Sequence, residues 1–167
     1  KVRILLLEKN LDVELKTENL WDRRREFLQI NPAGDVPVLV EENGHVICDS
    51  AAICEYLEEI KPTPNLLPGN PEQRSEIRRL VAWFDRKFNQ EVSENLVGEK
   101  ILKRFLKRGA PDASAIRAGK KNIHHHLNYI AWLCERRTWL AGSEISLADI
   151  AAAAHISSLD YLGEVPW

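Results

Sequence analysis

A proline-rich segment divides the sequence into two parts whose hydrophobic residues follow different patterns. Four of the eight prolines lie between Lys61 and Pro71. Proline has no backbone N–H and its ring fixes φ, so a cluster of prolines interrupts both helices and strands. We therefore predict a linker over residues 62–71, between one domain at residues 1–61 and a second at residues 72–167.

Helical and strand patterns alternate before the linker. The last two predicted strands flank Asn43-Gly44, a dipeptide that favours a hairpin turn because both residues tolerate positive φ. The first domain is therefore expected to be mixed α/β. The predicted elements are a helix over 1–9, a strand over 13–16, a helix over about 22–30, strands over 36–42 and 45–48, and a helix over 50–60.

Hydrophobic residues recur at helical spacing throughout the second part, which is therefore predicted to be all-helical. Breaks between helices are expected at residues 109–112 and 139–143. Residues 70–167 carry 15 basic and 12 acidic side chains, a net charge of +3, whereas residues 1–69 carry 8 and 13, a net charge of −5. The predicted buried stripes are Ile77, Leu80, Val81, Phe84 and Phe88, and then Ile123, Leu127, Ile130, Ala131 and Cys134.

The composition is that of an ordinary soluble protein, with 44% hydrophobic and 29% charged residues among 167. No hydrophobic run is long enough to span a membrane, so we expect a cytoplasmic protein that does not insert into membranes. The three cysteines, Cys48, Cys54 and Cys134, show no C-x-x-C spacing and are predicted to be buried structural thiols. The first helix has no capping residue and the chain has no methionine, so we expect further residues before Lys1.

The segment from Asn31 to Leu39 is the most informative motif in the chain. Pro37 stands at the start of an apolar strand and cannot donate to a strand ladder. A cis Val36–Pro37 bond would turn the Val36 N–H and C=O outward, where an extended peptide ligand could pair with them. A trans proline at a strand start is the alternative, and the residues alone favour it.

A second motif, Asp49-Ser50, lies where the predicted hairpin meets the next helix. Ser50 is a good helix-capping residue, and the free N–H groups at such a junction can bind a carboxylate. The motif therefore indicates either a simple helix cap or an anion-binding site.

These motifs, their order and the helical second half resemble the cytosolic glutathione transferase family. That family carries N-P-x-G-x-V-P-x-L, then an acidic residue or Gln with Ser at the next helix, in a thioredoxin-like domain that precedes an all-helical bundle. A third match is the capping box at Ser146 and Asp149, with Ile145 expected to contact Ile150. The resemblance implies a thioredoxin-like α/β domain that lacks its first strand, followed by an all-α domain that lacks its C-terminal end.

The resemblance also implies a function and a set of binding residues. Val36, beside a cis Pro37, would bind the cysteinyl unit of glutathione, and Ser50 and Asp49 would hold its γ-glutamyl end. Trp21 would direct its indole N–H toward the glycyl carboxylate, with a packed core tryptophan as the alternative. The catalytic residue that activates the thiol is expected before Lys1. A homodimer that conjugates glutathione to an electrophile is thus the implied activity.

Two features depart from the family pattern. Many members have Lys or Gln immediately before Val-Pro, whereas this chain has Asp35, whose charge would repel the glycyl carboxylate. A basic stripe is also predicted on one helical face, backed by Ile101, Leu102, Phe105 and Leu106. It indicates either a solvated face or a surface for an acidic protein partner, and nucleic acid is disfavoured by the overall negative charge. The stripe comprises Lys100, Lys103, Arg104, Lys107 and Arg108.

The sequence from Trp139 to Trp167 is most similar, within the family, to an alphaproteobacterial subgroup. That subgroup includes a cell-division protein that binds the bacterial tubulin homologue FtsZ. The alternative function is therefore a non-catalytic scaffold that binds FtsZ.

Histidines in the second half do not predict a metal site. Consecutive residues at 124–126 point about 100° apart on a helix, and none has a ligand-type residue four positions away. His155 lies in an alanine-rich helix and is interpreted as a buried histidine with satisfied hydrogen bonds.

Overall fold

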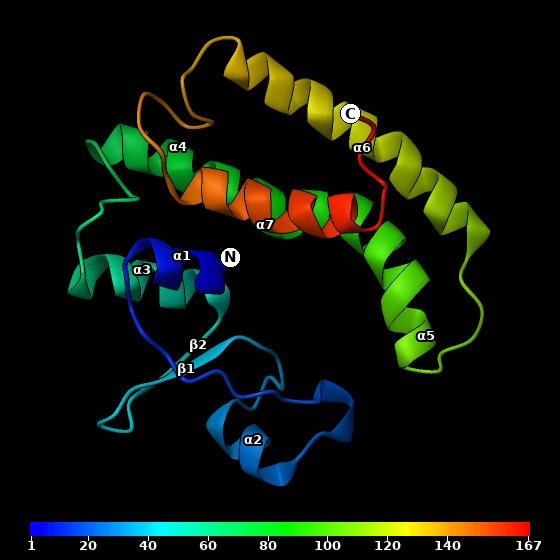
Figure 1. Ribbon diagram of the computed structural model, residues 1–167, viewed down its shortest axis with the longest axis horizontal. Coiled ribbons are helices and arrows are strands. Elements are labelled where there is room, and N and C mark those ends of the chain that lie inside the picture. The colour runs from blue at the N-terminus through cyan, green and yellow to red at the C-terminus, as the bar shows by residue number, and fades with distance from the viewer. The chain divides into compact units, whose positions relative to one another are not determined.

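The computed structural model describes residues 1–167, which form two compact units, Lys1–Leu66 and Leu67–Trp167 (Figure 1). The boundary between the units falls inside the predicted proline-rich linker, where the Thr63–Pro64 peptide bond is cis. None of the helices is both long enough and apolar enough to cross a membrane.

The first unit is mixed α/β, as predicted. Its core lies between α1 and α3, where Leu5 and Leu6 of one helix and Ile53 and Leu57 of the other are buried. Its elements are α1 (Val2–Glu8), η1 (Leu20–Asp22), α2 (Arg25–Ile30), β1 (Val38–Val40), β2 (Val46–Cys48) and α3 (Ser50–Ile60).

Strands β1 and β2 form an antiparallel hairpin in which Val38 lies opposite Cys48. Both strands are shorter than predicted. In the turn, the Gly44 N–H donates to the Glu41 carbonyl at 2.9 Å, and Gly44 has a φ of 87°. Asn43 does not adopt positive φ, so glycine alone supplies the left-handed residue that this turn requires.

Two predicted elements of the first unit are wrong. Residues 13–16 form no strand, because the sheet contains only β1 and β2 and offers this segment no partner; Val13 and Leu15 are exposed. The second helix begins at Arg25 rather than near Asp22, because Arg23 has a φ of 44°, a left-handed conformation that ends η1.

A buried ion pair that was not predicted anchors the segment after α3. The Lys9 ammonium has no exposed side-chain area and lies 2.8 Å from a Glu58 carboxylate oxygen. The same ammonium donates to the carbonyls of Lys61 at 2.7 Å and Pro64 at 2.9 Å, while Glu58 accepts the Leu66 N–H at 3.0 Å. Because a buried charge must be paired, this cluster ties residues 61–66 to the end of α1 and to α3 within the first unit.

The second unit is all-helical, as predicted. α4, η2 and α5 follow one another without a break and form one continuous helix that bends along its length, called the rod below (Figure 1). Bonding of the i→i+5 type marks the end of η2, where the Lys103 N–H donates to the Gly98 carbonyl. Gly119 brings α6 close to η2, since a Cβ there would lie 2.9 Å from side chains of Asn95 and Leu96. The elements are α4 (Pro71–Ala82), η2 (Trp83–Leu102), α5 (Lys103–Phe105), α6 (Ala113–Cys134) and α7 (Leu147–Tyr161).

The first predicted stripe is essentially confirmed, with Val81 only half-buried, but the second is out of phase. On α6, Ala131 and Cys134 are exposed, whereas His126 and Leu133 are buried alongside Ile123. His126 can take a core position although it is polar, because both of its ring nitrogens are hydrogen-bonded there. Of the cysteines, Cys54 is buried, Cys48 is half-buried and Cys134 is exposed, so the prediction of a buried thiol at Cys134 is wrong.

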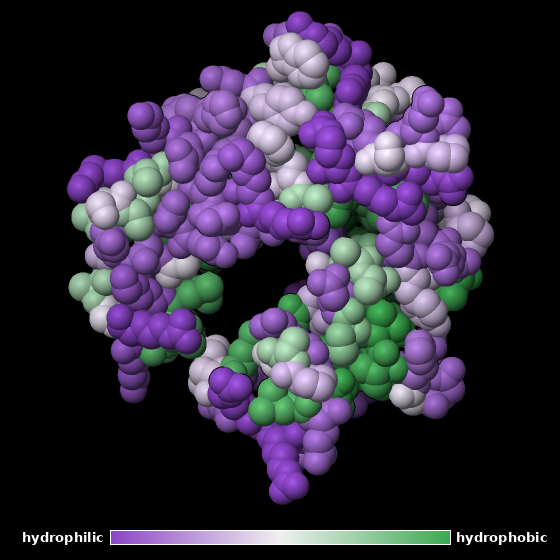
Figure 2. Space-filling model, turned by 180° about the vertical axis from the view of Figure 1, so that it is seen from behind, coloured by the Kyte–Doolittle hydropathy of each residue, from purple (hydrophilic) through white to green (hydrophobic).

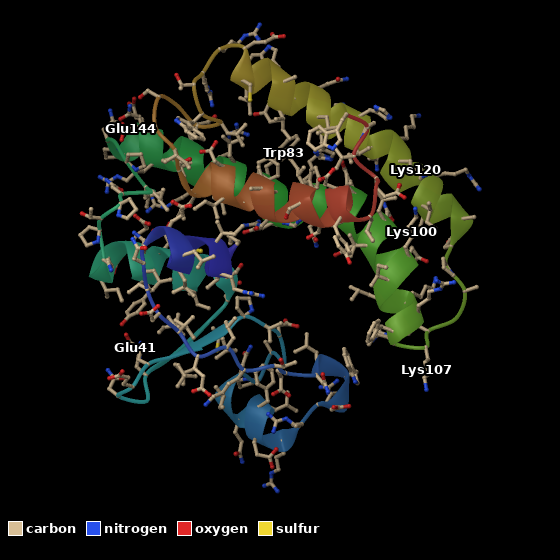
Figure 3. All side chains as sticks on the ribbon, viewed as in Figure 1. Glu41, Trp83, Lys100, Lys107, Lys120 and Glu144 are labelled. Atoms are coloured by element: carbon tan, nitrogen blue, oxygen red, sulfur yellow. The ribbon has the colours of Figure 1, made fainter.

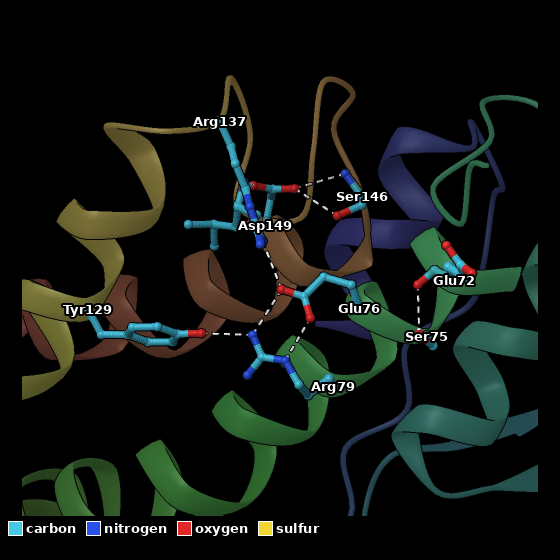
Figure 4. A network of polar contacts seen from close by, with 9 residues as sticks. Glu72, Ser75, Glu76, Arg79, Tyr129, Arg137, Ser146 and Asp149 are labelled. Atoms are coloured by element: carbon cyan, nitrogen blue, oxygen red, sulfur yellow. Dashed lines mark hydrogen bonds and ion pairs between the residues drawn. The ribbon is translucent and has the colours of Figure 1, made fainter. Parts of the chain in front are cut away.

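The predicted capping box at the start of α7 is confirmed (Figure 4). The Asp149 carboxylate accepts the Ser146 N–H at 2.9 Å and, through its other oxygen, the Leu140 N–H at 2.9 Å. Arg137 donates to the Leu140 carbonyl and to Glu76, both within 2.9 Å. The guanidinium groups of Arg79 and then Arg137 lower the pKa of Glu76 to about 2. The loop before α7 is thereby tied to α4 and α6.

Candidate functional site

The hairpin register brings the two predicted binding motifs to the same end of the first unit. Val38 pairs with Cys48 at the end of the ladder, so the Val36-Pro37 and Asp49-Ser50 motifs adjoin the same end of the hairpin. Both motifs therefore lie next to the point where β2 leads into α3. The site is built by backbone pairing rather than by a cluster of ionisable side chains.

The Val36–Pro37 peptide bond is cis, as the family resemblance implies and against the trans form that the residues alone favour. Val36 is half exposed, and neither its N–H nor its C=O forms a hydrogen bond within the protein. A free donor and acceptor on one residue at the entrance to a strand can pair with the backbone of a peptide ligand.

Asn31 holds the loop before Val36 in place, a role that the sequence analysis did not assign. It is buried, and its side-chain amide donates to the Asp35 carbonyl at 2.8 Å while its side-chain oxygen accepts the Ala33 N–H at 3.2 Å. Gly34 has a φ of 73°, and a Cβ there would lie 3.2 Å from Leu28. The Asn-Pro-x-Gly motif is thus a rigid turn that presents Val36, and the Asp35 side chain remains exposed.

Asp49, and not Ser50, caps α3. One Asp49 carboxylate oxygen accepts the N–H groups of Ala51 at 2.7 Å and Ala52 at 3.2 Å, and Ser50 is the first residue of the helix. The Ser50 N–H and hydroxyl make no hydrogen bond within the protein. The helix start therefore keeps an unpaired backbone donor and a hydroxyl side by side, the kind of group that binds a carboxylate.

Trp21 lies in η1 and is 54% exposed, so the alternative of a packed core tryptophan is wrong. Its predicted role toward a ligand carboxylate stays a prediction.

The predicted basic stripe of the second unit does not form a single helical face. α5 ends at Phe105, and Lys107 adopts a left-handed φ of 52°, which takes Lys107 and Arg108 off the helix. The residues predicted to back the stripe are not buried either; Phe105 is 73% exposed and Leu102 52%. The prediction fails because it extended helical spacing to Arg108, three residues beyond the end of α5 at Phe105.

Acidic side chains neutralise two of the five basic residues. Lys100 pairs with Glu164, which Lys120 also approaches at 3.4 Å; the two lysines are labelled in Figure 3. Lys103 pairs with Glu99 at 2.9 Å. Arg104, Lys107 and Arg108 are exposed and have no carboxylate partner.

A polar cluster around His126 was also missed. The His126 ring is fully buried; it accepts the Trp83 indole N–H at 3.1 Å and lies 2.9 Å from a Glu91 carboxylate oxygen. Burial lowers the pKa of His126, and the carboxylate opposes that shift only in part. The neutral ring, with its remaining proton directed to Glu91, satisfies both contacts. His155 is only partly buried and contacts the Ser93 hydroxyl at 3.0 Å.

No group of three or more His, Cys, Asp or Glu side chains is arranged to hold a metal ion. Two sets of unpaired polar groups stand out: the backbone and hydroxyl groups at the hairpin end, and the exposed cations Arg104, Lys107 and Arg108 in and just after α5.

Comparisons with known proteins agree with this architecture. Residues 1–60 match the family model described as glutathione S-transferase, N-terminal domain. FtsZ-localized protein A of Caulobacter vibrioides is 48% identical over the whole of this chain, which spans 75% of that protein. A probable maleylacetoacetate isomerase of Drosophila melanogaster is 39% identical over 87 residues, which make up 35% of its length.

Solved structures extend the likeness to the whole chain. A glutathione S-transferase from Rhodospirillum rubrum is 58% identical, with a TM-score of 0.96 over 99% of this chain and 75% of that one. FzlA from C. crescentus is 48% identical, with a TM-score of 0.95 over the same shares. These matches confirm the predicted fold, a thioredoxin-like α/β domain followed by a helical bundle, and the chain belongs to the glutathione S-transferase family.

Proposed function

We propose that this protein binds glutathione at the end of the hairpin and presents its thiol to an electrophile. The observation that carries the proposal is that the unpaired Val36 backbone groups and the unpaired N–H and hydroxyl of Ser50 adjoin the same end of the hairpin. Family membership supports glutathione as the ligand. No metal enters the proposed mechanism.

Each end of the tripeptide has a chemical counterpart at this site. The cysteinyl unit would pair with the Val36 N–H and C=O as an added strand, next to the cis Pro37. The γ-glutamyl carboxylate would accept from the Ser50 N–H and hydroxyl at the start of α3. Asp49 uses one carboxylate oxygen as the helix cap, which leaves the other for the γ-glutamyl ammonium. The Trp21 indole would serve the glycyl carboxylate.

Calorimetric titration with glutathione tests the assignment of Ser50. Ser50→Ala removes the hydroxyl but keeps the helix, because Asp49 supplies the cap. A charge-assisted hydrogen bond is worth about 1.5–3 kcal/mol, so affinity should fall by about tenfold or more. Ser75→Ala, which removes a helical serine hydroxyl from the second unit, is the matched control. Equal affinity in both variants would remove Ser50 from the site.

A second function, a scaffold that binds FtsZ in cell division, is favoured by a separate observation. A relative named for its localisation with FtsZ is 48% identical over the full chain. The three unpaired cations Arg104, Lys107 and Arg108 would suit an acidic protein partner. On this proposal the protein is cytoplasmic, acts as a homodimer, and needs no thiol chemistry.

Co-pelleting with FtsZ polymers tests the scaffold. Wild-type protein should sediment with assembled FtsZ and not without it. The readout does not depend on glutathione, so each function can fail without the other.

A further inference from the structure

We propose that the end of the η2–α5 rod is a docking surface for an acidic peptide segment that carries large apolar side chains. This surface, called the tip below, comprises Ile101, Leu102, Arg104, Phe105, Lys107 and Arg108. The proposal rests on the scaffold function proposed above, because it names the surface through which the scaffold would contact its protein partner.

The apolar part of the tip is continuous. Ile101, Leu102 and Phe105 have 39%, 52% and 73% of their surface exposed. At about 100° per residue these three side chains span roughly a quarter of the helix circumference, and Arg104 borders them on one side. Single exposed hydrophobic residues are ordinary, but a continuous apolar stripe with a charged border is typical of a binding surface.

The charged part of the tip is held by the backbone. The chain folds back after Phe105: the Lys107 N–H donates to the Arg104 carbonyl at 3.1 Å and the Arg108 N–H to the Lys103 carbonyl at 2.9 Å. The Lys107 side chain extends away from the end of the rod (Figure 3). The backbone therefore places three residues whose cations have no carboxylate partner next to the apolar stripe.

The nearby acids do not cancel this charge. Glu99 is engaged by Lys103 and also accepts the Asp112 N–H at 2.6 Å. Glu164 is engaged by Lys100 and Lys120. The tip is therefore net positive, and seen from behind it combines hydrophobic and hydrophilic groups (Figure 2).

An acidic, partly apolar peptide matches both parts of the tip. Opposite charge would bring the peptide to Arg104, Lys107 and Arg108, and its apolar side chains would cover Leu102 and Phe105. A second copy of the same tip is disfavoured because like charges would face each other. Nucleic acid would use the cations but would leave the apolar stripe exposed to water.

Fluorescence anisotropy with labelled synthetic peptides tests the proposal. The probe is a short peptide that mixes Asp and Glu with Phe and Leu. One matched peptide replaces its acids with amides, and another replaces its Phe and Leu with Ser. Wild-type protein should bind the probe, and each matched peptide should bind at least tenfold more weakly.

Two variants assign the binding to the tip. Leu102→Ser with Phe105→Ser should weaken probe binding by tenfold or more, and so should Arg104→Glu with Lys107→Glu. Arg117→Glu, an exposed charge reversal on α6, should leave it unchanged. Thermal melts followed by circular dichroism establish that each variant is folded.

The proposal would be overturned if the protein did not bind the probe, or if Arg117→Glu weakened probe binding as much as the tip variants do. It would also be overturned if the Ser-substituted peptide bound as tightly as the probe, or if the protein bound phosphatidylserine vesicles more tightly than the probe. Wild-type sedimentation with FtsZ that persists in both tip variants would overturn it while leaving the scaffold function intact. Probe binding without FtsZ sedimentation would support the tip and contradict the scaffold.

Discussion

The hairpin end of the first unit and the tip of the second offer two different kinds of binding surface. At the hairpin end the available groups are mainly backbone atoms of Val36 and Ser50, presented by a buried Asn31 and a capped helix. At the tip they are long exposed side chains at the end of the rod and in the residues that directly follow it. Function at the hairpin end should therefore depend on the residues that hold the backbone, whereas function at the tip should depend on the surface residues themselves.

The largest expected effect comes from the framework of the first unit. Lys9→Met leaves Glu58 as a buried carboxylate without its cation, and breaking such a pair costs about 3–5 kcal/mol of unfolding free energy. Urea denaturation measures the loss. Lys16→Met, which removes an exposed lysine, should change stability by less than about 0.5 kcal/mol.

The double variant Lys9→Met with Glu58→Leu is the sharper control. It removes both charges, so it should be clearly more stable than Lys9→Met alone. A single variant as stable as wild type would show that the pair does not hold this region.

A smaller effect is expected from the cap beneath the site. Asp49→Ala removes the acceptor for two N–H groups of α3 and should cost about 1–2 kcal/mol. Asp49→Gly also loses the carboxylate, but glycine tolerates the φ of 76° that strains alanine. We expect Asp49→Gly to be the more stable of the two in urea denaturation; the reverse order would contradict the observed backbone conformation.

The second unit should lose stability in acid through its buried histidine. The pKa of His126 is lowered by burial, so the unfolded chain binds a proton more readily than the folded one. Its stabilising contribution is complete above the unfolded pKa of about 6.5 and declines as the pH falls below that value. The pKa of Glu91 is also lowered, chiefly by Lys87, which adds a further loss at lower pH.

Trp83 fluorescence during acid titration reports this change, because the indole N–H donates to His126. His126→Gln should flatten the dependence near pH 6. A wild-type curve that is flat between pH 7 and 5 would contradict the account of this cluster.

The smallest stability effect is expected at the tip. Arg104 and Lys107 have no carboxylate partner, so Arg104→Glu with Lys107→Glu should change the unfolding free energy by no more than about 0.5 kcal/mol. A large loss in urea denaturation would mean that the tip is part of the framework and not a free surface.

The sequence predicts best the features that depend on neighbouring residues. The bounds of α3, the hairpin around Gly44 and the capping box at Ser146 all follow from local spacing and turn chemistry. The cis bond at Val36 was implied only by the family resemblance, because nothing in the local sequence selects it over the trans form.

Features that depend on distant partners were missed. Residues 13–16 have a strand pattern, but the sheet gives them no neighbour. The contacts of Lys9 with Glu58 and of His126 with Glu91 join residues 49 and 35 positions apart, and no spacing rule marks them. The prediction of a basic stripe on one helical face was wrong for a different reason. The helix ends at Phe105, four residues before Gly109, where the sequence signals its end.

The central claim is that glutathione binds at the hairpin end, and Asp35 gives the most direct test of it. The Asp35 side chain is exposed next to Val36, where it would repel the glycyl carboxylate. Asp35→Lys removes that repulsion and supplies a donor, whereas Glu42→Lys makes the same charge change in the hairpin turn.

Calorimetric titration of glutathione into the three proteins is the measurement. We predict weak binding by wild type, an affinity about tenfold higher for Asp35→Lys, equivalent to about 1.4 kcal/mol, and no change for Glu42→Lys. The absence of binding in both wild type and Asp35→Lys, or an equal gain in both lysine variants, would contradict the claim.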